Sequence, residues 1–419
     1  MKLTKNPAPE PAPVAPSGGH VPESQRKIGD YARDYVDGIK GGELGSLPIF
    51  IGMLIICIVF QSQNDQFLTS GNFVNLILQS AAFMTIGMGV VWVLLLGEID
   101  LSIGYVSGVA GVITAILLTP DGNTSPTAVA IVIAILSGTA IGTFHGILFT
   151  KIGIPSFVVT LAGLLAWNGV VLLLIGSRGT VTLQDDFTIG LANDFLSPEL
   201  AWLGVVAAAG IYAGAQLNEV RVRRAAGLGH EPMLLVGLRI GALTLALAAV
   251  VAIANDDRGI PWVFVLVGAL LLFWTYILKR TKFGRYVFAV GGNVEAARRA
   301  GINVDRIRIS VFAIASTMAA IGGIILASRL RSVDTNAGGG SILLYSIAAP
   351  VIGGTSLFGG RGTIKSAILG AIVIASIDNG LGLLGLGSGE KFVITGGVLL
   401  LAVTVDSLSR RKQTASGRA

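Results

Sequence analysis

Long apolar runs, separated by short polar segments, fill the chain from residue 45 onward. A helix of about 20 apolar residues is long enough to cross the hydrocarbon core of a bilayer. Twelve runs approach this length and predict helices over residues 45–61, 78–97, 101–119, 128–150, 155–176, 200–217, 233–254, 260–278, 309–328, 342–358, 364–378 and 391–407. The pattern therefore predicts an all-α, polytopic transmembrane helical bundle with about 10–12 spans.

Two of these runs contain features that interrupt a simple span. Pro350 and the Gly-Gly pair at 353–354 lie inside the run 342–358, and they predict a broken or re-entrant helix. Asp378, the last residue of the run 364–378, and Asn379 after it predict that this helix ends there, at the outer face.

The polar segments divide the chain into three parts. Residues 1–44, rich in Pro and Ala, predict a disordered N-terminal tail; residues 45–407 form the membrane domain; residues 408–419 form a basic C-terminal tail. With the N-terminus in the cytoplasm, the cytoplasmic segments hold 24 of the 30 Lys and Arg residues, and the loop 279–308 holds 8 of them. The positive-inside rule therefore predicts that both termini and this loop are cytoplasmic.

The composition supports a membrane protein and excludes other classes. Hydrophobic residues make up 53% of the chain and charged residues 13%, about half the charged share of a soluble domain. Membrane lipid is therefore the expected surroundings. The net charge of +6 comes from residues that flank apolar runs, so it does not indicate nucleic-acid binding. Cys57 is the single cysteine, which excludes an intrachain disulfide.

An acidic pair interrupts the apolar pattern at GEIDLSIG, where Glu98 and Asp100 lie between two predicted spans. Carboxylates cost about 2.5–3.5 kcal/mol each near the centre of a membrane helix, so their presence calls for partners. One interpretation is that they face the transport pathway or a gate. The other is a short turn in which Asp100 caps the next helix.

The segment GTFHGILF places His145 inside a predicted span. An ionisable group at such a position can serve a proton relay. A histidine that packs between helices and bonds to a neighbour is the commoner role, and it is the interpretation favoured here.

The sequence lacks the groups that an enzyme of this size would use. No Gly-Lys dipeptide occurs, so the chain has no phosphate loop of the Walker type. No His, Asp and Glu cluster has metal-ligand spacing, and no nucleophile and base are suggested, so neither a metal site nor catalysis is expected. The chain itself is therefore expected to need no cofactor.

The basic loop 279–308 contains the segment EAARRAGI, which predicts a short helix capped by Asn293 and ended by Gly301. A short amphipathic helix on a cytoplasmic loop has the shape that docks into a groove of a soluble partner. The alternative is an ordinary charged loop.

Several motifs, in the same order, resemble the monosaccharide permeases of bacterial ABC importers, and most closely their xylose branch. They are GEIDLSIG, KIGIPSFVVTLAG, FGRYVFAVGGNVEAARRAGIN, AAPVIGGTSLFGGRGT and SIDNGLGLL. The resemblance runs from about residue 45 to 407, and the loops RVRRAAGLGHEP and NDDRGIP favour the xylose branch over the shorter ribose branch.

The resemblance implies a permease domain in a bacterial cell membrane that pairs with a second copy of itself. It also implies a separate cytoplasmic ATPase that uses ATP and Mg, and an extracytoplasmic sugar-binding protein. The segment EAARRAGI would then be the coupling helix. The residues expected to contact the ATPase are Glu295, Ala296, Ala297, Arg298 and Gly301.

Three positions depart from the pattern of that family. His145 stands where Asn is usual, Tyr345 where an acidic residue is common, and Asn168 where the xylose branch has a basic residue. Together with Glu98 and Asp100 they are the candidates for the pathway or gate.

Two other functions stay open from the sequence. An ion-gradient-driven secondary transporter would use Glu98, Asp100 and His145 as ion sites. An ABC permease for branched-chain amino acids would share the same architecture.

Overall fold

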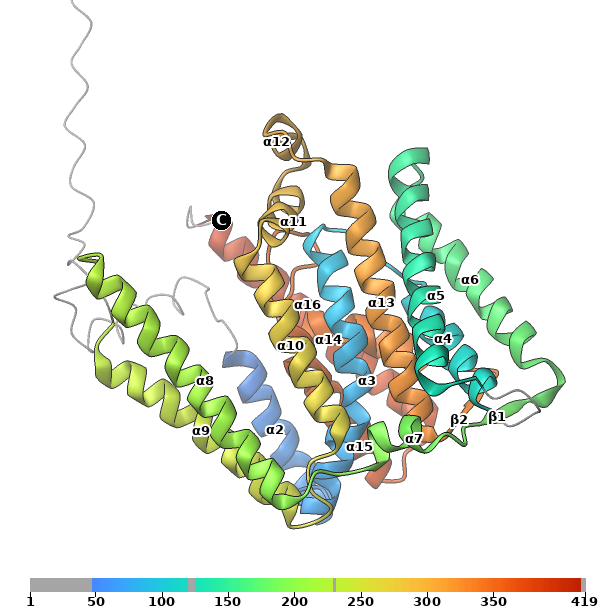
Figure 1. Cartoon of the computed structure of the whole chain (residues 1–419), viewed down its shortest axis with the longest axis horizontal. Helices are drawn as coiled ribbons and strands as arrows, with labels where there is room; N and C mark the ends of the chain where they lie inside the picture. The colour runs from blue at the N-terminus through green and yellow to red at the C-terminus, as the bar shows by residue number, and fades with distance from the viewer. Residues whose placement is uncertain (1–46, 120–124, 229–230, 416–419) are drawn as a thin grey trace, which may run out of the picture.

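The structure is a computed structural model that describes residues 47–119, 125–228 and 231–415 (Figure 1). The predicted N-terminal tail and the last four residues of the C-terminal tail lie outside the described residues. Within them the chain is mostly helical, with only two three-residue strands, which confirms the predicted all-α bundle.

Each of the twelve predicted runs forms a helix. They are α2 (Leu47–Gln63), α3 (Ser70–Leu95), α4 (Ile103–Leu118), α5 (Thr127–Ile147), α6 (Ser156–Ile175), α8 (Pro198–Ala225), α9 (Met233–Asn255), α10 (Trp262–Arg280), α13 (Val304–Leu330), α14 (Ser341–Ile352), α15 (Ile364–Leu383) and α16 (Ser388–Ala415). Shorter elements join them: η2 (Leu148–Ile152), η3 (Gly176–Arg178), β1 (Thr180–Thr182), α7 (Asp186–Asn193), α11 (Lys282–Gly292), α12 (Val294–Arg299) and β2 (Ser332–Asp334).

Eight of the described helices are long and apolar enough to cross a membrane, and α2, α4 and α14 are shorter apolar helices. The run 342–358 ends as a helix at Ile352, two residues after Pro350, as its proline and glycines predicted. The prediction that the run 364–378 ends at Asp378 is wrong, because α15 continues to Leu383.

The centre of the bundle is built around α3 and α13. Every residue of α3 from 80 to 95 is buried, as expected for a helix that is apolar on all sides. Glycines let α13 approach its neighbours closely: a Cβ added at Gly138 of α5 would lie 2.7 Å from the Cβ of Ala320. Such small-residue contacts are the usual way in which helices pack in lipid.

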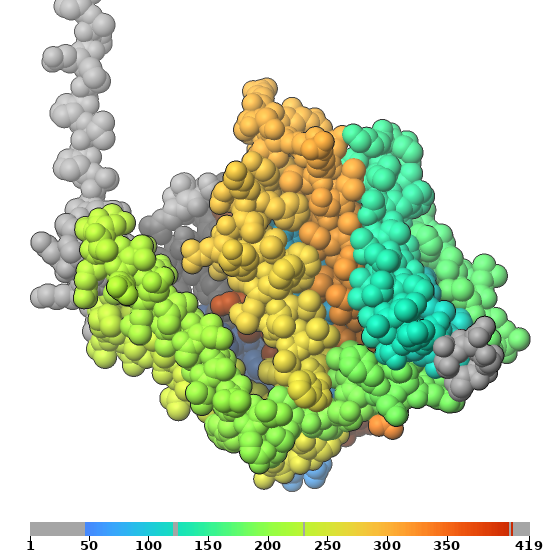
Figure 2. All heavy atoms as spheres, in the orientation of Figure 1, coloured from blue at the N-terminus to red at the C-terminus, as the bar shows by residue number. Residues whose placement is uncertain are grey.

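The outer helices carry the apolar surface that a membrane protein presents to lipid. Leu203, Ile211, Leu238 and Leu245 on α8 and α9 are exposed. Figure 2 shows α8 standing apart from α10, with a hollow between the two helices. The α8–α9 hairpin thus forms a separate arm whose surface suits acyl chains.

The two ends of the bundle differ. Figure 1 places α12 beyond one end, and α7, β1 and β2 at the other. Asp185 caps α7 by accepting hydrogen bonds from the backbone N–H and the hydroxyl of Thr188, at 2.8 and 2.7 Å. Burial acts to raise the pKa of Asp185, but these bonds and one from Thr127 hold it below its usual value.

Candidate transport and coupling sites

The helix α12 forms as the sequence predicted. The Asn293 side-chain oxygen accepts a hydrogen bond from the backbone N–H of Ala296 at 2.9 Å. Gly301 follows the helix with a φ of +80°, a conformation that favours glycine. The cap and the stop leave a helix of only six residues, which projects from the end of the bundle (Figure 1).

Four of the five residues predicted to contact a partner lie on the surface of this segment. Glu295, Ala296, Arg298 and Gly301 are exposed, and Arg298 forms an ion pair with Glu295 at 3.1 Å. The prediction for Ala297 is wrong, because its side chain is 3% exposed and belongs to the core. Ala297 instead anchors the inner face of α12, and its small size lets the helix lie close to the bundle.

The segment before α12 is tied to the centre of the bundle. Val287 and Val290 of α11 are buried, and a Cβ at Gly291 would collide with the carbonyl oxygen of Leu95 at the end of α3. The same carbonyl accepts a hydrogen bond from the N–H of Gly360 at 2.9 Å. The end of α11, which leads into α12, is therefore in direct backbone contact with the end of α3.

Glu98 joins this end of the bundle to α13 and α6. Its carboxylate accepts a hydrogen bond from the Ser156 hydroxyl at 2.5 Å and pairs with the Arg308 guanidinium at 3.4 Å. The guanidinium also lies over the ring of Phe149, 4.5 Å from its centroid. Nearby, Lys151 of η2 pairs with Asp305 of α13 at 2.8 Å. Four segments thus meet at the end of the bundle from which α12 projects.

Asp100 has different hydrogen-bond partners from Glu98. Its Oδ1 accepts hydrogen bonds from the N–H and the hydroxyl of Ser102, at 2.9 and 2.6 Å. Ser102, and not Asp100, occupies the N-cap position of α4, so the predicted capping role of Asp100 is wrong in its detail. Asp100 instead fixes the turn one step earlier in the chain.

His145 continues the chain of hydrogen bonds that begins at Asp100. The indole N–H of Trp167 donates to Nε2 of His145 at 3.1 Å, and Nδ1 lies 3.3 Å from the Ser102 hydroxyl. An Nε2 that accepts leaves the hydrogen on Nδ1, a tautomer assigned from this network. Nδ1–H then donates to Ser102, whose hydroxyl donates to Asp100. This directional chain supports the interpretation of His145 as a packing histidine.

The other two candidates from the sequence lie apart from this network. Tyr345 of α14 is buried, and its hydroxyl donates to Asp378 of α15 at 3.2 Å. Its ring meets the edge of Phe83 with centroids 5.5 Å apart. Asn168 lies on α6 next to Trp167, is partly exposed, and takes no part in the hydrogen bonds between Trp167, His145 and Ser102. The structure therefore does not bring the five pathway candidates into one site.

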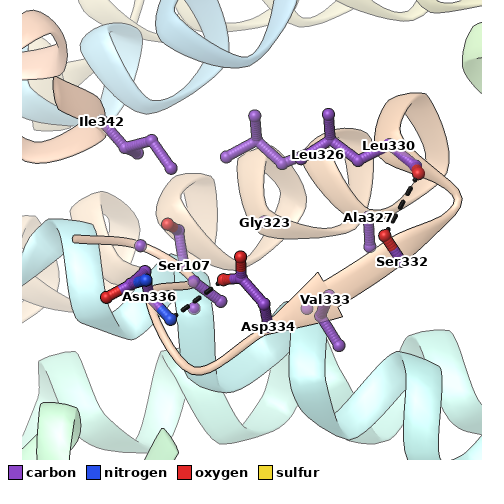
Figure 3. Close-up of a pocket in the computed structure, with 14 residues that line it drawn as sticks. Ser107, Gly323, Leu326, Ala327, Leu330, Ser332, Val333, Asp334, Asn336 and Ile342 are labelled. Carbon is purple, nitrogen blue, oxygen red and sulfur yellow. Dashed lines mark hydrogen bonds between the residues drawn. The ribbon is translucent and has the colours of Figure 1, made fainter. Parts of the chain in front are cut away.

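A pocket that the sequence did not predict lies between α4, α13, β2 and the start of α14 (Figure 3). Its volume is about 230 Å³, and its lining includes Ser107, Leu326, Asp334, Asn336 and Ile342. The only sequence signal for it is the interruption VDTNAGGGS between two apolar runs, which combines polar residues with three glycines.

A bundle of apolar helices, with a capped helix projecting from one end and a partly polar pocket near the other, is the architecture of a multi-pass membrane protein of the transporter class. Residues 72–404 match the family described as branched-chain amino acid transport system, permease component. The match covers most of the chain, so the chain belongs to this family.

Individual relatives cover almost the whole chain. The xylose transport system permease protein XylH of Escherichia coli K12 is 35% identical over 90% of this chain and 95% of its own. XylH of Haemophilus influenzae is 31% identical over 88% of this chain and 98% of its own. The ribose import permease protein RbsC of Escherichia coli K12 is 29% identical over 85% of this chain and 92% of its own. No solved structure matches the chain.

Proposed function

We propose that this chain is the permease subunit of an ATP-driven importer for a monosaccharide, with xylose as the first candidate, in a bacterial cell membrane. The observation that carries the proposal is the 35% identity to the Escherichia coli xylose permease over 90% of the chain. The ribose permease is less similar, at 29% identity. Xylose is therefore the sugar to test first.

In this function α12 is the coupling helix. It docks into a cytoplasmic ATPase subunit, which binds the ATP and Mg that drive transport. Support comes from the exposed Glu295, Ala296 and Arg298 and from the tight contact of α11 with α3. Movement of α12 would reach the segment 97–102 through Gly291 and through the Arg308–Glu98 ion pair.

The remaining partners follow from the same function. Two copies of the chain form the transporter, and an extracytoplasmic binding protein delivers sugar to the end opposite α12. Both chain termini lie in the cytoplasm with α12, as the distribution of Lys and Arg predicts.

A second candidate is import of branched-chain amino acids, because the description of the family names that cargo. The sugar function is preferred because the relatives with 29–35% identity carry the names of xylose and ribose permeases.

One experiment separates the candidates. The permease is reconstituted in proteoliposomes with the ATPase subunit and the binding protein encoded beside it, and uptake of radiolabelled D-xylose, D-ribose and L-leucine is measured with and without internal MgATP. We expect MgATP-dependent uptake of xylose that excess leucine does not inhibit. Uptake of leucine alone would select the second candidate. Xylose uptake that ignores MgATP and is abolished by a protonophore would instead indicate an ion-gradient transporter.

A further inference from the structure

The pocket shown in Figure 3 has two chemically different sides. The carboxylate of Asp334, the amide of Asn336 and the hydroxyl of Ser107 lie on one side, and the aliphatic side chains of Leu326 and Ile342 cover the other. A monosaccharide has the same division, with hydroxyl groups at the ring edge and C–H bonds on the ring faces. An ion would need polar ligands all round, whereas a purely apolar molecule would make no use of the polar side.

The polar groups of the pocket keep hydrogen-bonding capacity for a ligand. One oxygen of Asp334 accepts the backbone N–H of Asn336 at 2.9 Å, which orients the carboxylate and leaves its second oxygen able to accept from hydroxyls. The Ser107 hydroxyl donates to the carbonyl oxygen of Gly104 at 2.6 Å, so its oxygen can still accept. The amide of Asn336 supplies both a donor and an acceptor.

Backbone contacts fix the size of the pocket. A Cβ at Gly108 would collide with the carbonyl oxygen of Ala337, and a Cβ at Gly323 with that of Ser107. The walls therefore have no room to close further and are held by main chain. The volume of about 230 Å³ lies below the roughly 300–1,000 Å³ of pockets for drug-sized ligands. This space suits one small ring molecule and excludes an oligosaccharide.

We propose that this pocket is a monosaccharide subsite within a single permease subunit, in which Asp334, Asn336 and Ser107 bind sugar hydroxyls and Leu326 and Ile342 cover a ring face. The proposal rests on the proposed function and specifies where sugar is held at the end of the bundle opposite α12 (Figure 1). Sugar released by the binding protein occupies this subsite before it crosses the bundle.

Protection of an introduced thiol tests the subsite without requiring transport. Cys57 is the single native cysteine, so Cys57→Ser gives a background in which Ser332→Cys places one thiol on the pocket wall. The full-length permease is treated with a small thiol reagent with and without D-xylose. We expect millimolar D-xylose to slow the reaction at least fivefold and L-leucine to leave it unchanged. Gln63→Cys, an exposed position at the end of α2, is the matched control and should show no protection.

A transport measurement provides the second test. In the complete proteoliposome system, Asp334→Asn should raise the KM for D-xylose about tenfold, because a charged acceptor of hydroxyl groups becomes a neutral one. Asp256→Asn, an exposed carboxylate at the end of α9, should keep the wild-type KM.

The outcomes separate the subsite from the proposed function. If the wild-type system imports D-xylose while Ser332→Cys shows no protection and Asp334→Asn keeps the wild-type KM, the subsite is wrong and the function stands. If the wild-type system imports no monosaccharide, the function itself is wrong. Misfolding of Asp334→Asn does not affect the thiol measurement, which uses a different variant.

Discussion

Removing the charges of Glu98 and Arg308 measures how strongly α13 is joined to the segment between α3 and α4. The two groups are 3.4 Å apart, and their side chains are 17% and 19% exposed. Their Coulomb attraction is about 5 kcal/mol at an effective dielectric constant of about 20. Desolvation offsets much of this energy. An exposed ion pair contributes about 0–1 kcal/mol to stability, and breaking a buried one costs about 3–5 kcal/mol. Because this pair is mostly but not fully buried, we expect a coupling energy of about 2 kcal/mol between these ranges.

A double-mutant cycle of Glu98→Gln, Arg308→Met and the double variant isolates this energy. The cycle is needed because Arg308→Met also removes the contact of the guanidinium with Phe149. The free energy of unfolding is measured for the full-length permease in detergent micelles. Its change from the wild type in each of the three variants gives the coupling energy. The same variants in proteoliposomes should import less xylose per ATP hydrolysed, because the link between α12 and the segment 97–102 is weakened.

The control pair is Arg239 and Glu231, which are closer, at 2.7 Å, but 52% and 32% exposed. Its coupling energy should be below about 1 kcal/mol, because water screens an exposed pair. A coupling energy below about 0.5 kcal/mol for Glu98 and Arg308, or one no larger than that of the control pair, would refute the reasoning that burial makes this link strong.

Three further predictions concern other parts of the chain. Gly138→Ala should cost about 1–3 kcal/mol of unfolding free energy, because α5 and α13 must separate; Gly169→Ala, with no neighbouring atom within 4 Å, should be neutral or slightly stabilising in the same denaturation assay. Asn293→Ala should lower the stability of α12 by about 1 kcal/mol and speed amide hydrogen exchange in this helix, because the cap is lost. Asn293→Asp should do neither, because aspartate also caps a helix. Because the pKa of Asp185 is lowered by folding, its stabilisation is full above about pH 4 and is lost as the pH falls through the lowered value. Asp185→Asn should therefore flatten the acid limb of the unfolding midpoint plotted against pH, and an unchanged limb would contradict this assignment.

The positions of most helices could be predicted from the sequence. The run 233–254 became α9 over Met233–Asn255, because a helix that satisfies its own backbone in lipid needs only a long apolar stretch. The cap at Asn293 and the stop at Gly301 were also predictable, because both depend on residues within one turn of the helix.

The ends of two central helices could not be predicted in this way. α3 begins at Ser70, eight residues before the predicted start, and α15 extends five residues beyond Asp378. Polar residues near the ends of these runs predicted helix ends, because the sequence does not show the distant partners that satisfy them inside the bundle. Asn72 and Asn379 exchange two hydrogen bonds at 2.9 Å, which lets both amides stay inside the bundle.

The sequence by itself determined the class of the protein, its membrane helices and the capped helix α12. Only the tertiary structure decided that Ala297 faces inward, that Glu98 meets Arg308 across 210 positions, and that the pocket forms between Ser107 and Asp334. The physical reason is the distance along the chain over which each interaction acts. Apolar length and helix caps act between neighbouring residues, whereas ion pairs and pockets depend on how close packing of glycine-containing helices brings distant segments together.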